Sequence, residues 1–416
     1  MGTDTVAVSV MLYNPRSGEP GVPRKRAIVA PARGPDKTAF AGRRSASPLM
    51  PTVLTVVGAR PQFIKAAPLS RALRRRVREV LVHTGQHYDR DMSEAFFDEL
   101  GIPGPDRHLG IGSASHGAMT GRMLEALEAV MQETRPALVL VLGDTNSTLA
   151  GALAAAKLQI PVAHVEAGLR SFDPAMPEEI NRRLTDHVSS LLFCPTPTAE
   201  ANLRAEGITR GIHRVGDVMM DAVRQNLARA RRLPRPAGAP APRSYYLATL
   251  HRQENVDHPR RLTAILRALA ALPYPTVVPV HPRTRKAIAA LGLRAGGRLL
   301  LRAPATYLEM LVLESEARAV LTDSGGVQKE AFILGTPCVT LRDTTEWVET
   351  LENGANRLAG ADPVRIRRAV REIERARPRW SAGQVYGRGR AAEAVARVVA
   401  GFLARSARKA VTRRGR

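Results

Sequence analysis

The sequence predicts an α/β protein built from two Rossmann-like, doubly wound domains with a ligand cleft between them. Three observations predict this fold class. From residue 53 onward, short apolar runs alternate with helical stretches, which is the pattern of a parallel sheet covered by helices on both faces. The alternation is interrupted at residues 233–243 by a segment rich in proline and alanine, and then it resumes. Within the second series, a glycine turn separates a strand from a helix at residues 322–330, as in many nucleotide-binding domains.

The first series predicts a domain over residues 51–232. Its strands are expected at residues 53–57, 80–82, 138–142, 162–165, 191–193 and 213–215. Its helices are expected at residues 63–73, 92–100, 148–158 and 178–188. Each strand is short and apolar, and each helix is longer, so consecutive strands can pair in parallel through helical crossovers.

The second series predicts a domain over residues 244–390, joined to the first by a linker at residues 233–243. Its strands are expected at residues 246–249, 277–280, 299–301, 320–322 and 338–341. In open sheets of this kind, ligands bind beyond the carboxyl ends of the strands. The cleft between two such domains is therefore the expected site.

The formal charge of +24 comes in large part from the two ends of the chain. Residues 1–50 carry eight lysines and arginines against three acids, and residues 405–416 carry six against none. We expect both segments to be basic tails, the first of them disordered, because residues 1–50 show no sustained helical or strand period. Aromatic residues make up only 4% of the chain, so few side chains could stack on bases, and nucleic-acid binding is not expected as the main function.

Cysteine and apolar content narrow the class of protein further. Cys194 and Cys338 are the only cysteines, which leaves neither a disulfide framework nor a metal-ligand cluster and fits a reducing cytoplasm. No apolar run in the sequence is long enough to cross a membrane. We therefore expect a cytoplasmic protein that does not bind membranes and holds no metal.

The turn at residues 322–330 predicts a phosphate site. Ser324 can cap the following helix, and Gly325 and Gly326 let a ligand approach the backbone, so that unpaired N–H groups and the helix dipole point at one place. Glu330 lies within the first two turns of that helix, where its carboxylate could accept both hydroxyls of a ribose. A plain strand-to-helix turn is the alternative for this segment taken alone.

Acidic residues follow the strands of the first series. Asp144 lies beyond the strand at 138–142, Glu166 follows the strand at 162–165, and Glu178 begins the next helix. Glu178 alone would be explained by the helix dipole. Three acids at one sheet edge shift one another's pKa and can supply both an acid and a base at neutral pH.

Basic residues occupy the same edges. Arg60 and Lys65 follow the first strand and could face a diphosphate. His251 follows the first strand of the second series, which favours ligand contact over a place in the core. The loop at residues 342–347, which includes Arg342, could close over a sugar.

Nine segments in register resemble the non-hydrolysing UDP-N-acetylglucosamine 2-epimerase family over residues 52–360. They are GARPQFIK, HTGQHYD, LGDTNST, HVEAGLRS, PEEINRR, TLHRQEN, PVHPRT, TDSGGVQKE and RDTTEW. The resemblance implies the two-domain arrangement of one large class of glycosyltransferases, a homodimer, and a C-terminal helix at residues 391–404 that returns to the first domain. It also implies conversion of UDP-N-acetylglucosamine to UDP-N-acetylmannosamine.

The resemblance assigns residues to three groups. Those around the reacting sugar and diphosphate are Asp144, Glu166, Glu178 and His251. Those that bind UDP are Arg60, Lys65, Ser324, Gly325, Gly326, Glu330 and Arg342. Those that match an activator site, where some bacterial members bind a second substrate molecule, are Gln86, His87, Arg122, Arg252 and His281.

Two departures from the enterobacterial pattern concern the sugar end of the site. The segment between Glu166 and Glu178 is shorter, and Glu346 is followed by Trp-Val-Glu instead of Arg-Pro-Glu. The resemblance therefore indicates the nucleotide more firmly than the sugar, and a related UDP-2-acetamido sugar is an alternative substrate.

The sequence also favours one route for inverting C2. No G-x-G-x-x-G segment follows a strand, so we expect no nicotinamide cofactor and no transient oxidation. The remaining route is elimination, in which a carboxylate removes the C2 proton while UDP leaves, followed by re-addition of UDP. A UDP-sugar glycosyltransferase of the same fold is the competing function, although its reaction usually needs one base and an acceptor site.

Overall fold

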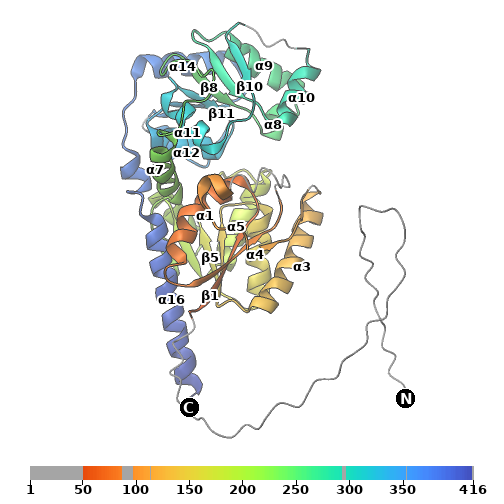
Figure 1. Cartoon of the computed structure of the whole chain (residues 1–416), viewed down its shortest axis with the longest axis vertical. Helices are drawn as coiled ribbons and strands as arrows, with labels where there is room; N and C mark the ends of the chain where they lie inside the picture. The colour runs from red at the N-terminus through yellow and green to blue at the C-terminus, as the bar shows by residue number, and fades with distance from the viewer. Residues whose placement is uncertain (1–49, 87–96, 113, 293–296, 353, 415–416) are drawn as a thin grey trace, which may run out of the picture. The chain divides into compact units, whose positions relative to one another are not determined.

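The computed structural model divides the chain into two units, Met1–Leu49 and Met50–Arg416. It describes residues 50–86, 97–112, 114–292, 297–352 and 354–414, with the side chains of the last helix described to residue 408. The expected disordered tail at residues 1–50 lies outside the described residues, except for Met50. The second unit carries two parallel α/β sheets, which confirms the predicted fold class (Figure 1).

The first sheet has seven strands in the order β3-β2-β1-β4-β5-β6-β7. Its strands are β1 (Thr52–Val57), β2 (Arg78–His83), β3 (Arg107–His108), β4 (Leu138–Leu142), β5 (Val162–Val165), β6 (Leu191–Cys194) and β7 (Ile212–Arg214). Its helices are α1 (Arg60–Leu73), α3 (His116–Thr134), α4 (Asn146–Lys157), α5 (Pro177–Val188), α6 (Pro197–Ala205) and α7 (Val218–Ala230). The strand order reverses between β1 and β4, so this sheet is doubly wound.

Alternating residues of the central strands supply two cores, one on each face of the first sheet. Val53 and Val57 of β1 pack with residues of α1 and α7. Leu54 and Val56 of the same strand pack on the other face with residues of α3 and α4. Because both faces are covered, the sheet lies inside the domain and only its strand ends reach the site.

The second sheet has six strands in the order β10-β9-β8-β11-β12-β13, which repeats the winding of the first. Its strands are β8 (Tyr246–Thr249), β9 (Thr276–Pro279), β10 (Leu299–Arg302), β11 (Val320–Thr322), β12 (Cys338–Thr340) and β13 (Asn356–Leu358). The accompanying helices are α8 (Gln253–Val256), α9 (Pro259–Ala270), α10 (Pro282–Ala290), α11 (Tyr307–Glu316), α12 (Gly325–Leu334), α13 (Glu349–Glu352), α14 (Pro363–Ala376) and α15 (Ala382–Tyr386). The reversal here lies between β8 and β11.

One helix, α7, contacts both domains, and the last helix packs on the first. α7 contacts α1 of the first domain and also α11 and α12 of the second. The last helix, α16 (Ala391–Arg414), packs on α1 and α7, with Val395 and Val399 fully buried. Asp221 of α7 fixes the start of α16. Its carboxylate accepts hydrogen bonds of 3.1 Å from the backbone N–H groups of Ala391 and Ala392.

We expected a helix at residues 391–404 that returns to the first domain, and α16 begins at Ala391 and is longer than expected. It continues to Arg414, through most of the segment that we expected to be a basic tail. The described residues between α7 and β8, which contain the expected linker at 233–243, form no helix or strand. The domain boundaries themselves stay a prediction.

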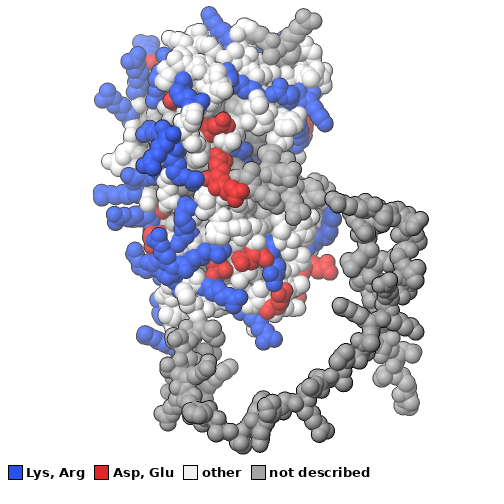
Figure 2. Space-filling view, viewed as in Figure 1, with Lys and Arg blue, Asp and Glu red and all other residues white. Residues whose placement is uncertain are grey.

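Basic side chains are interspersed with acids on the face shown in Figure 2 and gather on the side where α14 and α16 lie in Figure 1. α14 alone contributes five arginines between Pro363 and Ala376. Its apolar residues, among them Ile366 and Val370, face the core. This distribution is that of a solvated helix surface in an arginine-rich chain. Among the described helices, none is both long and apolar enough to span a membrane.

We expect a chain that begins at Met50 to fold and to keep most of its activity. The reason is the composition of residues 1–49, which lack a helical or strand period. Circular dichroism, thermal unfolding and turnover of the shortened and full-length chains would test this. Loss of soluble protein on removal of residues 1–49 alone would contradict the prediction.

Candidate active site

Candidate residues from both domains lie at the carboxyl ends of parallel strands, next to the two points where strand order reverses. β1, β4 and β5 lie side by side in the first sheet, and β8 and β11 do so in the second. Their following turns hold Arg60, Asp144 and Glu166 in one domain and His251 and Ser324 in the other. The topology thus places sequence-distant residues at adjoining sheet edges.

The turn into α12 has the expected cap. Ser324 is the N-cap residue, and its side chain accepts a 3.4 Å hydrogen bond from the N–H of Val327. A Cβ atom on Gly325 would lie 2.2 Å from Oε1 of Glu346, so a side chain there would require Glu346 to move. A Cβ on Gly326 would meet only Oγ of Ser324, at 3.7 Å. The backbone of α12 is therefore open at Gly326, where an anion could approach its N–H groups.

Glu330 is buried beneath this turn. Burial raises its pKa to about 7, although a hydrogen bond from Tyr307 and the charge of Arg60 oppose the shift. Among the described residues, Oε1 of Glu330 has no hydrogen-bond partner. A buried carboxylate oxygen without a partner is a costly arrangement, and a ligand hydroxyl would satisfy it.

A second buried acid, Glu314 of α11, lies close enough to Glu330 for the charge of Glu330 to act on it. Burial raises the pKa of Glu314 well above its ordinary value, and the Glu330 carboxylate adds to the shift. Within the described part of the chain, neither carboxylate oxygen of Glu314 is hydrogen-bonded. Two neighbouring buried acids disfavour double ionisation, so a proton is retained in this pair.

Glu166 lies between two lysines. It follows β5 in a left-handed backbone conformation, with φ of 71°. Its carboxylate pairs with Nζ of Lys65 and with Nζ of Lys329, the latter at 2.5 Å. Burial alone would raise its pKa, but the two ammonium groups outweigh burial and lower the pKa to about 2. Glu166 is therefore ionised throughout the physiological range.

Asp144 differs from Glu166 in its electrostatics. Its side chain is about a third exposed (34%), and Oδ2 lies 3.1 Å from NH1 of Arg182. Withdrawal from water raises the pKa of Asp144 despite Arg182, and the carboxylates of Glu178 and Glu166 raise it further. The site thus holds two carboxylates whose pKa values are moved in opposite directions, as in acid–base pairs.

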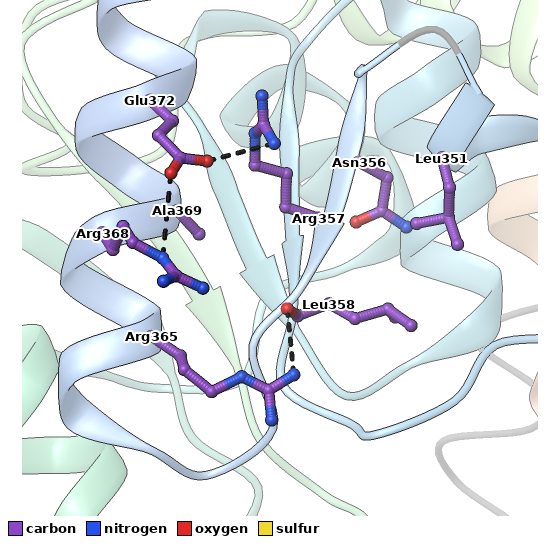
Figure 3. A pocket seen from close by; sticks show the side chains of 8 residues that line it. All are labelled: Leu351, Asn356, Arg357, Leu358, Arg365, Arg368, Ala369 and Glu372. Carbon is purple, nitrogen blue, oxygen red and sulfur yellow. Dashed lines mark hydrogen bonds and ion pairs between the residues drawn. The ribbon is translucent and has the colours of Figure 1, made fainter.

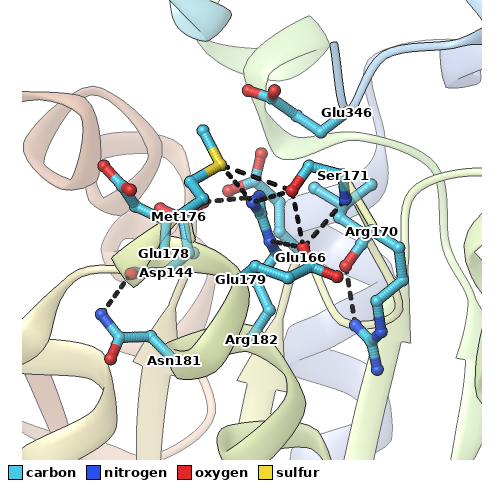
Figure 4. A network of polar contacts seen from close by, with 12 residues as sticks. Asp144, Glu166, Arg170, Ser171, Met176, Glu178, Glu179, Asn181, Arg182 and Glu346 are labelled. Atoms are coloured by element: carbon cyan, nitrogen blue, oxygen red, sulfur yellow. Dashed lines mark hydrogen bonds and ion pairs between the residues drawn. The ribbon is translucent and has the colours of Figure 1, made fainter. Parts of the chain in front are cut away.

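The start of α5 separates the roles of two neighbouring glutamates (Figure 4). Glu179 is buried and bonded to Arg182 at 3.2 Å and to the N–H of Ser171 at 2.8 Å. Glu178 is about a third exposed, and its Oε1 lies 3.8 Å from NH1 of Arg252 in the second domain. Glu179 therefore supports Arg182, whereas Glu178 can reach a ligand.

In the second domain, buried acids form hydrogen bonds and ion pairs with the predicted cationic residues. Asp323 accepts the backbone N–H of Arg252 at 3.1 Å and lies 3.0 Å from Nδ1 of His251, whose side chain is 55% exposed. Arg342 is buried and pairs with Glu346 at 2.9 Å. Burial would raise the pKa of Glu346, but the surrounding arginines, with Arg342 the strongest, lower it to about 2. Glu346 is drawn above the first-domain acids in Figure 4.

The described candidates for an activator site lie on separate elements. Gln86 follows β2 and accepts a 2.7 Å hydrogen bond from Ser147, and Arg122 is exposed on α3. Arg252 precedes α8, and His281 is the exposed N-cap residue of α10. His87 lies outside the described residues. Their assignment to an activator site stays a prediction.

Sequence reasoning missed four buried residues that shape the site: Lys329, Asp217, Asp323 and Glu314. Asp323 could have been found, since it immediately precedes the predicted cap Ser324 at a strand end. Lys329 and Asp217 act only through contacts between residues far apart in the chain, which the sequence pattern does not contain.

A surface pocket of about 240 Å³ lies elsewhere, between β13 and α14 (Figure 3). Its lining residues are Leu351, Asn356, Arg357, Leu358, Arg365, Arg368, Ala369 and Glu372. Glu372 lies 3.1 Å from Arg357 and 3.7 Å from Arg368. None of the predicted site residues lines this pocket, so it is separate from the candidate active site.

Comparison with known proteins decides the family. Residues 71–400 match the sequence profile of the family described as UDP-N-acetylglucosamine 2-epimerase. The chain belongs to this family. As a member of the UDP-N-acetylglucosamine 2-epimerase family, it is an enzyme of the UDP-sugar 2-epimerase type, and the resemblance found in its sequence is confirmed.

Two relatives and one solved structure illustrate the substrates named within the family. UDP-2,3-diacetamido-2,3-dideoxy-D-glucuronate 2-epimerase of Pseudomonas aeruginosa is 51% identical over 84% of this chain and 99% of its own. UDP-N-acetylglucosamine 2-epimerase of Methanocaldococcus jannaschii is 43% identical over 83% of this chain and 97% of its own. A crystal structure of UDP-GlcNAc 2-epimerase from M. jannaschii, in complex with UDP-GlcNAc and UDP, matches with a TM-score of 0.77 at 42% identity, over 84% of this chain and 98% of that one.

Proposed function

We propose that this enzyme reversibly inverts C2 of a UDP-linked 2-acetamido sugar, with UDP-N-acetylglucosamine and UDP-N-acetylmannosamine as the first candidate pair. The observation that carries the proposal is a direct contact between the helix that follows the predicted phosphate turn, in the second domain, and an acid of the first domain. Lys329 of α12 lies 2.5 Å from Glu166. A diphosphate at the start of α12 would therefore place an attached sugar near Glu166 and Asp144.

The reaction proceeds by elimination and re-addition. A carboxylate takes the C2 proton, the C1–O bond breaks, and its electrons leave with UDP, which produces a 2-acetamido glycal. UDP then adds back at C1 while a carboxylic acid delivers a proton to the opposite face of C2. The first carboxylate ends protonated and the second acid ends ionised, so the protons balance over one turnover.

Electrostatics favours Asp144 over Glu166 as the group that exchanges protons. Glu166, with a pKa near 2, is a weak base, whereas the raised pKa of Asp144 makes it a better one. Glu178 lies within electrostatic reach of Asp144 and is the candidate for the other face of C2. Ionised Glu166 is suited to stabilise positive charge that develops at the sugar ring as UDP leaves.

The leaving diphosphate would be held by the second domain and by the first turn of α1. Ser324, Gly325 and Gly326 offer backbone N–H groups, and Arg60 and Arg342 offer positive charge. Glu330 would accept the ribose hydroxyls through its unpartnered oxygen. His251, held by Asp323, would donate to the diphosphate.

The diacetamido glucuronate named for the P. aeruginosa relative is the second candidate sugar. That relative is 51% identical to this chain, against 43% for the M. jannaschii UDP-N-acetylglucosamine enzyme. Such a sugar carries an added carboxylate at C6. Arg252, at 22% side-chain exposure, is a cation available to pair with it in the cleft.

Product analysis distinguishes these substrates. The enzyme would be incubated in deuterated water with each UDP sugar, without nicotinamide or metal, and the product analysed by mass spectrometry and NMR. We expect a C2 epimer that carries deuterium at C2. Retention of the original proton at C2 would contradict elimination, and transfer of the sugar to an acceptor without epimerisation would favour the glycosyltransferase alternative. The homodimer and the cytoplasmic location stay predictions.

A further inference from the structure

Lys329 occupies a place that the nucleotide-binding role of α12 does not explain. Its side chain is almost fully buried (1% exposed), and its Nζ lies 2.5 Å from Oε1 of Glu166 and 2.7 Å from Oδ2 of Asp217. The same atom lies 3.9 Å from the centre of the Trp347 ring, which adds a cation–π contact. The ammonium group of a lysine from the second domain thus lies between two acids of the first domain.

The surroundings of Lys329 are organised to receive it. Asp217 is the N-cap of α7: its Oδ1 accepts a 2.7 Å hydrogen bond from the N–H of Met219, which leaves Oδ2 for Lys329. On the other side of Glu166, a Cβ on Gly143 would lie 3.3 Å from Oε2 of Glu166 and 3.6 Å from Nζ of Lys65. The four charged groups of Lys65, Lys329, Glu166 and Asp217 sum to zero, as a buried cluster requires.

The backbone of Glu166 provides the second indication. A non-glycine residue with φ of 71° is held in a sparsely populated conformation. Strain of this kind persists where neighbouring contacts fix it, and it gathers at functional sites. The carboxylate of Glu166 is bonded on both oxygens by lysines from different domains, so its direction depends on the two domains meeting as they do.

We propose that Lys329 is a positioning residue of the reaction: with Asp217 as its anchor, it holds Glu166 ionised and directed toward the sugar when the two domains are joined. This inference rests on the proposed function of Glu166. Lys329 acts through Glu166, without a contact to the substrate. It also couples nucleotide binding to chemistry, because Lys329 belongs to the same helix as the predicted phosphate turn.

Titratable groups from several elements lie around Glu166. Lys65 comes from α1, Lys329 from α12, Asp144 from the turn after β4, Asp217 from the start of α7, and Tyr386 from α15. Among these described groups, the two lysines are the ones that favour its ionised form. Removing the charge of Lys329 must therefore raise the pKa of Glu166, since burial and the remaining acids then oppose a single ammonium.

The experiment compares three variants by the pH profile of kcat and by NMR titration of the Glu166 carboxyl carbon in ¹³C-glutamate-labelled protein. Lys329→Met removes the charge at similar length. We expect a Glu166 titration displaced upward by roughly one pH unit or more and a kcat below the parent value across the pH profile, because Glu166 is no longer held toward the sugar.

Asp217→Asn is the matched control, because it removes the anchor and leaves both lysines on Glu166. We expect no upward displacement in this variant. The double variant Lys329→Met, Asp217→Asn removes one charge of each sign, so Asp217 is not left unpaired in the interior. If Lys329→Met alone does not fold, the double variant is measured in its place. It should show the same upward displacement as Lys329→Met.

Unchanged kcat profiles and an unchanged Glu166 titration in folded Lys329→Met or in the double variant would overturn the proposal, even with a lower Tm, since a purely structural lysine predicts that result. Failure of the parent enzyme to epimerise either UDP sugar is a separate outcome that would overturn the proposed function. The NMR titration would then still decide whether Lys329 sets the ionisation of Glu166.

Discussion

Asp144→Asn is expected to lower kcat for epimerisation by about 100-fold or more while UDP affinity stays within about threefold of the parent value. Asparagine keeps the shape of the side chain and can still contact Arg182, which lies 3.1 Å from Oδ2 of Asp144. It cannot accept or return a proton, so the loss falls on the chemical step. Single-turnover kinetics at saturating UDP sugar, with UDP binding measured by calorimetry, would test both parts.

A matched control comes from α3. Glu133 is exposed and pairs with Arg107 on the surface, so Glu133→Gln changes the net charge by the same amount away from the site. We expect parent-like turnover from it. If Asp144→Asn turned over like the parent, the assignment of proton transfer to Asp144 would be wrong, and Glu178 would be the next carboxylate to examine.

The fold was predictable because its signals are local. Apolar runs ended where β1, β4 and β5 end, and the proline- and alanine-rich segment separated two sheets of matching strand order. β3 and β13 were missed because their sequences, Arg-His and Asn-Arg-Leu, contain too few apolar residues to show a strand pattern. α3 was also missed, although its buried Met123, Leu127, Val130 and Met131 have helical spacing.

The site was predictable only where a residue's place followed from its strand. Ser324 and Asp144 lie just beyond the carboxyl ends of β11 and β4, as the sequence pattern predicted. Glu314 gave no such signal, because a glutamate in a helix is ordinarily solvated, and its burial depends on the packing of α11 against neighbours elsewhere in the chain. The pairing of Glu166 with Lys329 likewise joins residues 163 positions apart. Charge pairing across a domain boundary has no local pattern.

UDP affinity is expected to depend on the ionisation of Glu330. Its pKa is raised to about 7 by burial, and the ribose hydroxyls need an ionised acceptor. Between pH 8 and pH 6 the ionised fraction falls from about nine tenths to about one tenth, so UDP should bind about tenfold more weakly at pH 6. Calorimetry in buffers of different ionisation enthalpy should also detect protons released on binding below pH 7. The phosphates of UDP titrate as well, so the comparison must be made against a variant that lacks the carboxylate.

Glu330→Gln is that variant. It retains an acceptor oxygen but no charge, so UDP should bind roughly 10- to 150-fold more weakly at pH 8, the equivalent of losing about 1.5–3 kcal/mol from charged hydrogen bonds. The gap between parent and variant should narrow at pH 6.

The stability of the ligand-free protein should depend on pH in the opposite sense to UDP affinity. The pKa of Glu330 in the folded chain lies above its ordinary value of 4.5, so the folded state holds this proton more tightly than the unfolded chain. Its contribution to the free energy of unfolding therefore decreases as the pH rises from about 4.5 to about 7. Glu330→Gln, which cannot ionise, should raise Tm relative to the parent more at pH 8 than at pH 5. An equal effect on Tm at both pH values, with UDP affinity unchanged, would show that Glu330 neither carries a buried charge nor binds the ribose.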